Sequence, residues 1–140
     1  MITQGLCNIF RINLLKGLED FDVASASVYK MALYNANADI GADTTNYTSA
    51  NEISGTGYTA GGIILTKIAP AYSGSTAYVS FGTAVWNPAS FSARGALIYN
   101  ATTGFAVAVL DFGADKTDAN GIFTITFPTA DVNNAIIRIS

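Results

Sequence analysis

Residues 94–113 have the sequence RGALIYNATTGFAVAVLDFG, and this stretch predicts two β-strands joined by a turn. The strands are expected at Ala96–Tyr99 and Phe105–Phe112, with the turn at Asn100–Gly104. The first strand is apolar on both faces. The second strand also carries apolar side chains on both faces. A strand without a polar face must be covered on both sides. We therefore expect this hairpin at the centre of a β-sandwich, covered by a second sheet or by a partner.

Further short strands surround this hairpin in the sequence. They are predicted at Val28–Tyr34, Ile63–Ala69, Thr76–Phe81, Ala84–Ala93, Ile122–Phe127 and Ala135–Ile139, with a polar turn at Ala114–Gly121. The total is about eight strands with no helix between any of them. This pattern favours an all-β fold, an antiparallel β-sandwich of jelly-roll type with one N-terminal helix; an immunoglobulin-like arrangement is the second choice.

The N-terminal segment carries the only convincing helical pattern, from Leu6 to Phe21. Leu6, Phe10, Leu14 and Leu18 recur at every fourth residue. The helix either lies on its own sandwich or reaches to a neighbouring subunit as an arm. We expect residues 1–26 to form this helix or arm and residues 27–140 to form the sandwich.

The low share of charged residues indicates either an extracellular, hydroxyl-rich protein or one whose surface is partly an interface, and we favour the interface. Charged residues make up 12% of the 140 residues, about half the usual share of roughly 25%. The net charge is −3 and the seven Lys and Arg residues are scattered, which argues against nucleic-acid binding.

The sequence contains no predicted membrane span and no predicted signal peptide. No apolar run is long enough to span a membrane, and charged residues interrupt the apolar stretch that an N-terminal signal peptide would need. We expect a protein made in the cytoplasm without a signal peptide.

The sequence contains few residues that commonly act in catalysis. There is no histidine, and the only glutamates are Glu19 and Glu52. Asp111, Asp115 and Asp118 lack the spacing of a calcium loop, and Gly55–Ala60 fits a dinucleotide fingerprint but precedes a predicted strand. The sequence predicts a protein that is not an enzyme, with no metal and no cofactor.

Several segments, taken in order, resemble a known family. They are Tyr29–Tyr34, Thr45–Gly62, Ala93–Asn100, Ala106–Gly113 and Asn134–Ile139. Together they are similar to small virion structural proteins of tailed bacteriophages, including a jelly-roll capsid cement (decoration) protein of a short-tailed phage. The resemblance implies a non-enzymatic protein on the outer surface of the capsid that binds and stabilises the major capsid protein of the same virion. It carries no catalytic residues over to this chain.

The candidate contacts lie in the long polar loop and in the N-terminal helix. In the loop they are Asn51, Glu52, Ile53 and Tyr58, and in the helix Leu6, Phe10 and Leu14. We also expect self-association, with a homodimer favoured.

The alternative function is a carbohydrate- or receptor-binding jelly-roll module of a phage fibre or adhesin. Its stacking platforms would be Trp86, Tyr47 and Tyr58, although Trp86 is also the expected core tryptophan.

Overall fold

A computed structural model describes all residues from Met1 to Ser140. Its elements are β1 (Gly5–Leu6), α1 (Asn8–Leu15), β2 (Tyr29–Tyr34), β3 (Ile63–Ile64), β4 (Ala71–Ser73), β5 (Thr76–Val79), β6 (Ala84–Asn100), β7 (Ala106–Ile125) and β8 (Ile137–Ile139). The strands form a five-stranded sheet in the order β1-β7-β6-β2-β3 and a three-stranded sheet in the order β4-β5-β8, and every pairing of strands is antiparallel. The predicted all-β sandwich with one helix is confirmed.

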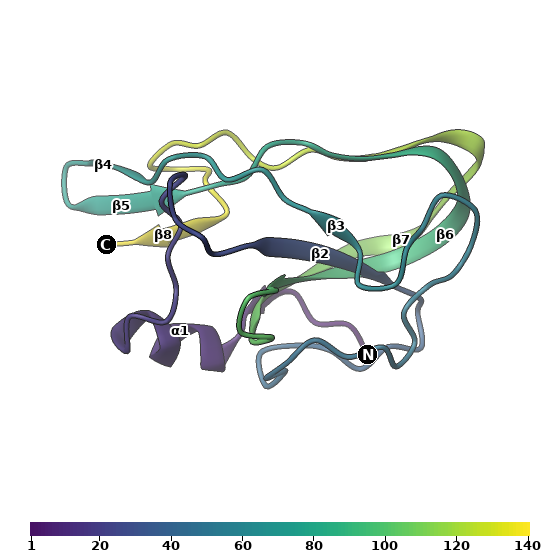
Figure 1. The fold of residues 1–140 in the computed structure, drawn as a ribbon, viewed down its shortest axis with the longest axis horizontal. Coiled ribbons are helices and arrows are strands. Elements are labelled where there is room, and N and C mark those ends of the chain that lie inside the picture. Colours follow the sequence, from purple (N-terminus) through teal and green to yellow (C-terminus); the bar gives the residue numbers. More distant parts are fainter.

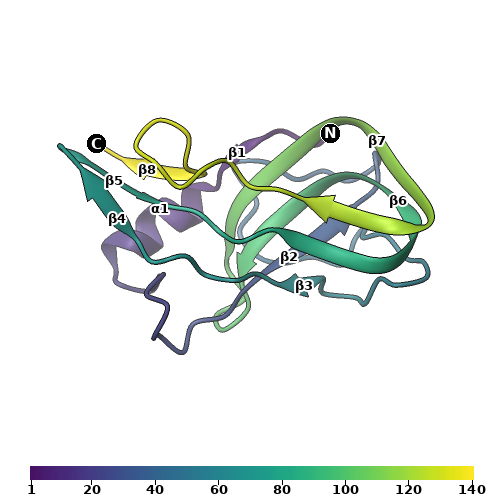
Figure 2. The same ribbon diagram turned by 90° about the horizontal axis from the view of Figure 1, so that it is seen from above.

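The β6–β7 hairpin belongs to the five-stranded sheet and also reaches over one face of it (Figure 1). Figures 1 and 2 show its two strands running side by side through the middle layer and then bending back over the top. The pairing shifts register between Trp86 and Ala89, between Ala89 and Phe91, and between Ala93 and Gly95. Such irregularities bend a strand pair and increase its twist. One hairpin therefore forms part of the five-stranded sheet and part of the layer that covers it.

Two sequence-based boundaries are wrong in this hairpin. Residues 84–93 and 96–99 belong to one strand, β6, because a bulge bends the ladder between them without ending it. Residues 114–121 were expected as a turn but form the middle of β7. Their polar side chains are mostly exposed at the bend, so their composition resembles that of a turn although their backbone is paired.

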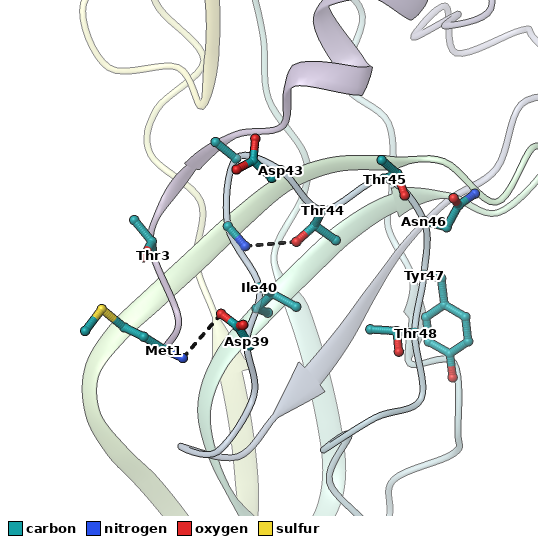
Figure 3. Close-up of a pocket in the computed structure, with 12 residues that line it drawn as sticks. Met1, Thr3, Asp39, Ile40, Asp43, Thr44, Thr45, Asn46, Tyr47 and Thr48 are labelled. Carbon is teal, nitrogen blue, oxygen red and sulfur yellow. Dashed lines mark hydrogen bonds and ion pairs between the residues drawn. The ribbon is translucent and has the colours of Figure 1, made fainter.

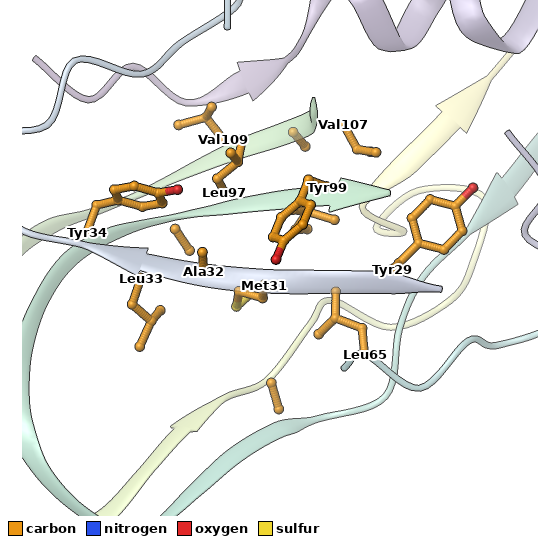
Figure 4. Packing of buried hydrophobic residues seen from close by; sticks show 14 of the residues in the cluster. Tyr29, Met31, Ala32, Leu33, Tyr34, Leu65, Leu97, Tyr99, Val107 and Val109 are labelled. Carbon is orange, nitrogen blue, oxygen red and sulfur yellow. The ribbon is translucent and has the colours of Figure 1, made fainter. Parts of the chain in front are cut away.

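The core lies on both faces of β2 and its neighbour β6. All the residues of β6 from Ala96 to Asn100 are buried, and β2 is buried except at Lys30. Figure 4 shows Leu33 and Tyr34 of β2 pointing to opposite sides of the sheet. One side receives the upper layer, and the other receives α1 and residues 35–48, which lie below the sheet in Figure 1. The chain itself thus covers both faces of the central hairpin.

The N-terminal helix is shorter than predicted and has a different inner face. Helix α1 ends at Leu15, two residues before Gly17, whose φ of +71° lies in the left-handed region that ends helices. Leu6 precedes the helix in β1, which pairs with β7, and Leu18 follows it. No helix in the structure is long enough and apolar enough to cross a membrane.

Candidate interaction surfaces

The loop between β2 and β3 is organised by one carboxylate, that of Glu52. Tyr58 Oη donates to its Oε1 at 2.6 Å, and the backbone N–H of Gly61 donates to the same oxygen at 2.7 Å. Tyr47 Oη donates to its Oε2 at 2.5 Å. Hydrogen bonds to a charged acceptor are shorter and stronger than neutral ones. Glu52 therefore ties three separate points of the loop, residues 47, 58 and 61, to one half-buried group.

Four further contacts fasten this loop to the sheet. Tyr99 Oη donates to the carbonyl of Gly61 at 2.6 Å, and the Tyr47 ring stacks on the Tyr99 ring with centroids 4.9 Å apart. The N–H of Leu33 donates to Tyr58 Oη at 2.9 Å. The Tyr58 ring meets Phe91 edge-on at 5.8 Å. The loop is a fixed layer on the sandwich.

Two glycines let this loop lie directly against neighbouring backbone. Gly57 and Gly62 both have positive φ, +89° and +83°. A Cβ atom on Gly57 would lie 1.8 Å from the carbonyl oxygen of Pro88, and one on Gly62 would lie 1.8 Å from that of Met31. Only glycine fits at either position. Gly55–Ala60, which matched the dinucleotide fingerprint, lead into strand β3 and not into a helix.

The environment of the tyrosines favours their neutral form. Burial raises the pKa of Tyr47 and of Tyr58, and the neighbouring Glu52 carboxylate raises both further. The same two causes, burial first, raise the pKa of Tyr34 and of Tyr99. All four hydroxyls therefore remain protonated around neutral pH, and all four donate to acceptors in this loop.

The predicted loop contacts divide into inward-facing and outward-facing residues. Ile53 is buried in the core, and its N–H donates to the carbonyl of Leu33. Glu52 and Tyr58 are half-buried in the cluster described above. Asn51 is exposed, with a φ of +61°, and its side chain donates to the carbonyl of Asn37. Of the four, Asn51 alone presents its side chain largely to solvent.

The predicted helix contacts are also partly internal. Phe10 is fully buried and meets Phe21 edge-on at 5.9 Å. Leu6 and Leu14 are half-buried. On the outer side of α1 lie two residues that the fourth-residue pattern did not select, Ile12 and Leu15, which are 47% and 90% exposed. Asn13, in contrast, is buried, so the helix turns apolar side chains toward solvent and an amide inward.

An apolar groove opens between α1 and the three-stranded sheet. It has a volume of about 120 Å³ and is lined by Leu14, Phe21, Pro70, Ala77, Tyr78, Val79, Ile137 and Ile139. Tyr72 pairs with Ala77, which pairs with Ile139, so these three side chains share one face of the sheet. Tyr72 and Ile139 are 78% and 55% exposed. We call this surface, from the exposed side of α1 to Tyr72, the helix groove.

A second exposed apolar area lies on the outer half of the β6–β7 hairpin. Val85 pairs with Thr124, and Ile122 lies two residues before Thr124 on the same face. Val85 is 42% exposed and Ile122 is 56% exposed. Beside them is a hollow of about 600 Å³ lined in part by Phe112, Lys116 and Ile125. We call this area the hairpin patch; none of its residues lines the helix groove.

A polar hollow of about 840 Å³ lies between the N-terminus and residues 39–48 (Figure 3). Asp39, Asp43 and Asn46 line it together with several threonine hydroxyls. Tyr47 lines it at one side, with its hydroxyl held by Glu52. This hollow offers hydrogen-bond donors and acceptors around an open space.

The acidic residues of β7 do not gather into a metal site. Arg94 Nε lies 3.8 Å from Asp111 Oδ1, and its Nη1 lies 3.7 Å from Asp115 Oδ1. Asp118 Oδ1 lies near Gly121 at the bend. No group of three or more Asp, Glu, Cys or His side chains is arranged to hold a metal ion.

Comparison of this chain with known protein families, curated proteins and solved structures finds no match.

Proposed function

We propose that this chain is a virion structural protein of a tailed bacteriophage, a capsid cement or decoration protein that binds the outer surface of the head. Its partner is the major capsid protein. It acts without catalysis or cofactor, by adding contacts between neighbouring subunits of the shell.

The observation that best supports this proposal is the presence of two separate exposed apolar areas on one small molecule. The helix groove and the hairpin patch lie on different elements and share no residue. Exposed apolar areas on soluble proteins commonly mark interaction sites. A molecule with two such areas can contact two other molecules at once, a shell subunit and a second copy of itself included, and can therefore link neighbouring subunits.

The fixed loop suits the same role. A surface that is already ordered loses little conformational entropy when it binds. The Glu52 cluster orders residues 47–61 before any partner arrives. Many modest contacts repeated over a shell then add up, because each bound copy holds its neighbours in place.

Heads assembled with and without the protein test the proposal. We expect heads that lack it to form with normal geometry and to release DNA at a lower temperature and after milder osmotic shock. Adding the purified protein back to these heads restores resistance. If stripped heads resist heat and shock as well as complete heads, the cement role is wrong.

A second candidate is saccharide binding at the polar hollow beside Tyr47. Two of the three stacking platforms expected for this role are engaged elsewhere: Trp86 is 5% exposed in the core, and Tyr58 packs against Phe91. Tyr47 lines the hollow next to carboxylate, amide and hydroxyl groups, although its ring also stacks on Tyr99. A glycan array with the wild-type chain and Asp43→Ala tests this. Binding that Asp43→Ala abolishes favours an adhesin, and absence of binding removes this candidate.

A further inference from the structure

We propose that the helix groove is a self-association surface, whose occupant is a second copy of this chain related by a twofold axis. This inference does not depend on the role in the virion, because it concerns the purified chain alone. It assigns one of the two apolar areas to the chain itself and leaves the hairpin patch free.

The surface offers an apolar projection from α1 and an apolar groove that the same helix lines in part. Leu15 is 90% exposed at the end of α1, and the preceding residue, Leu14, lines the groove. A twofold contact uses the same surface on both copies, so that surface must complement itself. A projecting apolar side chain together with an apolar groove meets this requirement, because each copy supplies the side chain that enters the groove of the other.

The floor of the groove carries no charge. Every lining residue is uncharged, and Tyr72, which extends the same sheet face, is also uncharged. Two copies of a chain with a net charge of −3 repel one another wherever their acids meet. An uncharged centre avoids this repulsion at the closest point of contact.

Exposed charges of both signs lie close in the chain to two residues that line the groove, Leu14 and Phe21. Lys16 caps the end of α1, and Asp20 and Asp22 flank the groove residue Phe21 in the chain. All three are exposed. A twofold arrangement can place Lys16 of each copy near the acids of the other. This complementarity favours a second copy over an unrelated partner, because the surface supplies both halves of each pair.

The outer side of α1 agrees with this assignment. A helix that only covers its own sandwich would bury leucine and expose asparagine. Here Asn13 is 1% exposed, while Ile12 and Leu15 are 47% and 90% exposed. The apolar side chains on the outer side of α1 gain burial only when another molecule covers them.

Analytical ultracentrifugation tests the proposal over concentrations from about 1 µM to 1 mM, a range that covers weak and moderate dimers. We expect a monomer–dimer equilibrium for the wild-type chain. Leu15→Glu should raise the dissociation constant at least about tenfold, as expected for a central apolar contact. The matched control Ile122→Glu, on the hairpin patch, should leave the constant unchanged. Both positions are exposed, so both variants should fold, and thermal melting at low concentration checks this.

The charge reversal Lys16→Glu tests the charge complementarity. It should weaken the dimer, because the new carboxylate would face acids of the second copy. The proposal is overturned if the wild-type chain is monomeric throughout this range, or if Leu15→Glu dimerises as tightly as wild type. It is equally overturned if Ile122→Glu alone disrupts the dimer, or if Lys16→Glu has no effect on it.

Discussion

Two half-buried carboxylates, Glu52 and Glu19, differ in how well their oxygens are satisfied. Both oxygens of Glu52 accept hydrogen bonds. Glu19 Oε2 accepts from Tyr29 Oη at 2.8 Å and from Asn100 Nδ2 at 3.3 Å, but Glu19 Oε1 is buried without a partner. Burial raises the pKa of Glu19 in spite of these two hydrogen bonds. The Glu52 carboxylate therefore stabilises the fold, whereas the charged form of Glu19 destabilises it.

We predict that replacing each glutamate by glutamine has opposite effects at neutral pH. Glu52→Gln should lower the free energy of unfolding by about 1–2 kcal/mol, because charge-assisted hydrogen bonds become neutral ones. Glu19→Gln should raise it, because a desolvated charge is removed. Urea unfolding measures both. Equal losses in the two variants would contradict the assignment of Glu19 as a strained carboxylate.

The pH dependence of the Glu19 effect has a definite sign. Its raised pKa means that the folded chain holds this proton more tightly than the unfolded chain. The stability that this proton provides is fully present below the pKa of Glu19 in the unfolded chain, and it is lost as the pH rises through the pKa of Glu19 in the folded chain. The advantage of Glu19→Gln over wild type should therefore shrink as the solution is acidified.

The buried tyrosines and Cys7 predict a loss of stability in alkaline solution. Burial raises the pKa of the Cys7 thiol to about 11, and it also raises the pKa of Tyr29, Tyr34 and Tyr58. For each group the stability is present below the unfolded pKa, and it falls as the pH rises from there toward the folded pKa. The melting temperature should thus decline above about pH 9, near the unfolded thiol pKa. Phenolate absorbance should appear for these tyrosines only together with unfolding; ionisation while the chain is still folded would contradict their burial.

At the scale of elements, the outer half of the β6–β7 hairpin depends on one aromatic cluster. The Phe123 ring lies 5.0 Å from Phe91 and 5.7 Å from Trp86, measured between ring centroids. We predict that Phe123→Ala costs about 3–5 kcal/mol through the cavity that it leaves. Thr124→Ala, on the exposed face of the same strand, should cost less than about 1 kcal/mol. Urea unfolding compares the two, and similar costs would mean that the register of β7 is wrong.

The loop between β2 and β3 depends on backbone contact at Gly62. Gly62→Ala should cost about 3 kcal/mol or more, because its Cβ would overlap the carbonyl of Met31 and the backbone would have to move. Gly5→Ala is the matched control, since a Cβ there meets nothing within 4 Å. Thermal melting measures both variants. A small effect at Gly62 would show that the loop can lift from the sheet without loss.

Sequence patterns predicted the strands in which buried and exposed residues alternate. They failed where contacts between distant parts of the chain determine the structure. The alternation of Phe123 with Thr124 predicted the buried face correctly, and Trp86 is in the core as expected. The bend at residues 114–121 was missed, because exposed paired strand and turn have the same polar composition. The Glu52 cluster was missed as well. Its members come from residues 47, 52, 58, 61 and 99, and only the fold brings Tyr99 to the loop.

The helix illustrates the same limit in another way. A spacing of four selected Leu6, Phe10, Leu14 and Leu18, but only Phe10 is fully buried. Leu6 lies in strand β1, and the helix ends before Gly17, so the four residues from Leu6 to Leu18 do not lie on one helix. Sequence periodicity could not show that Asn13 faces inward or that Leu15 faces solvent.

For the whole molecule, the assignment of separate roles to the two apolar areas predicts that they can be disrupted independently. Ile122→Glu should abolish binding to phage heads while leaving the dimer of the free chain intact, because the hairpin patch would carry the shell contact. Leu15→Glu should bind heads as a monomer and protect them less, because a monomer has one shell contact where a dimer has two. Co-sedimentation with stripped heads measures binding, and DNA release on heating measures protection. If Leu15→Glu protects heads as fully as wild type, the dimer plays no part in bracing; if Ile122→Glu still binds, the shell contact lies elsewhere on the molecule.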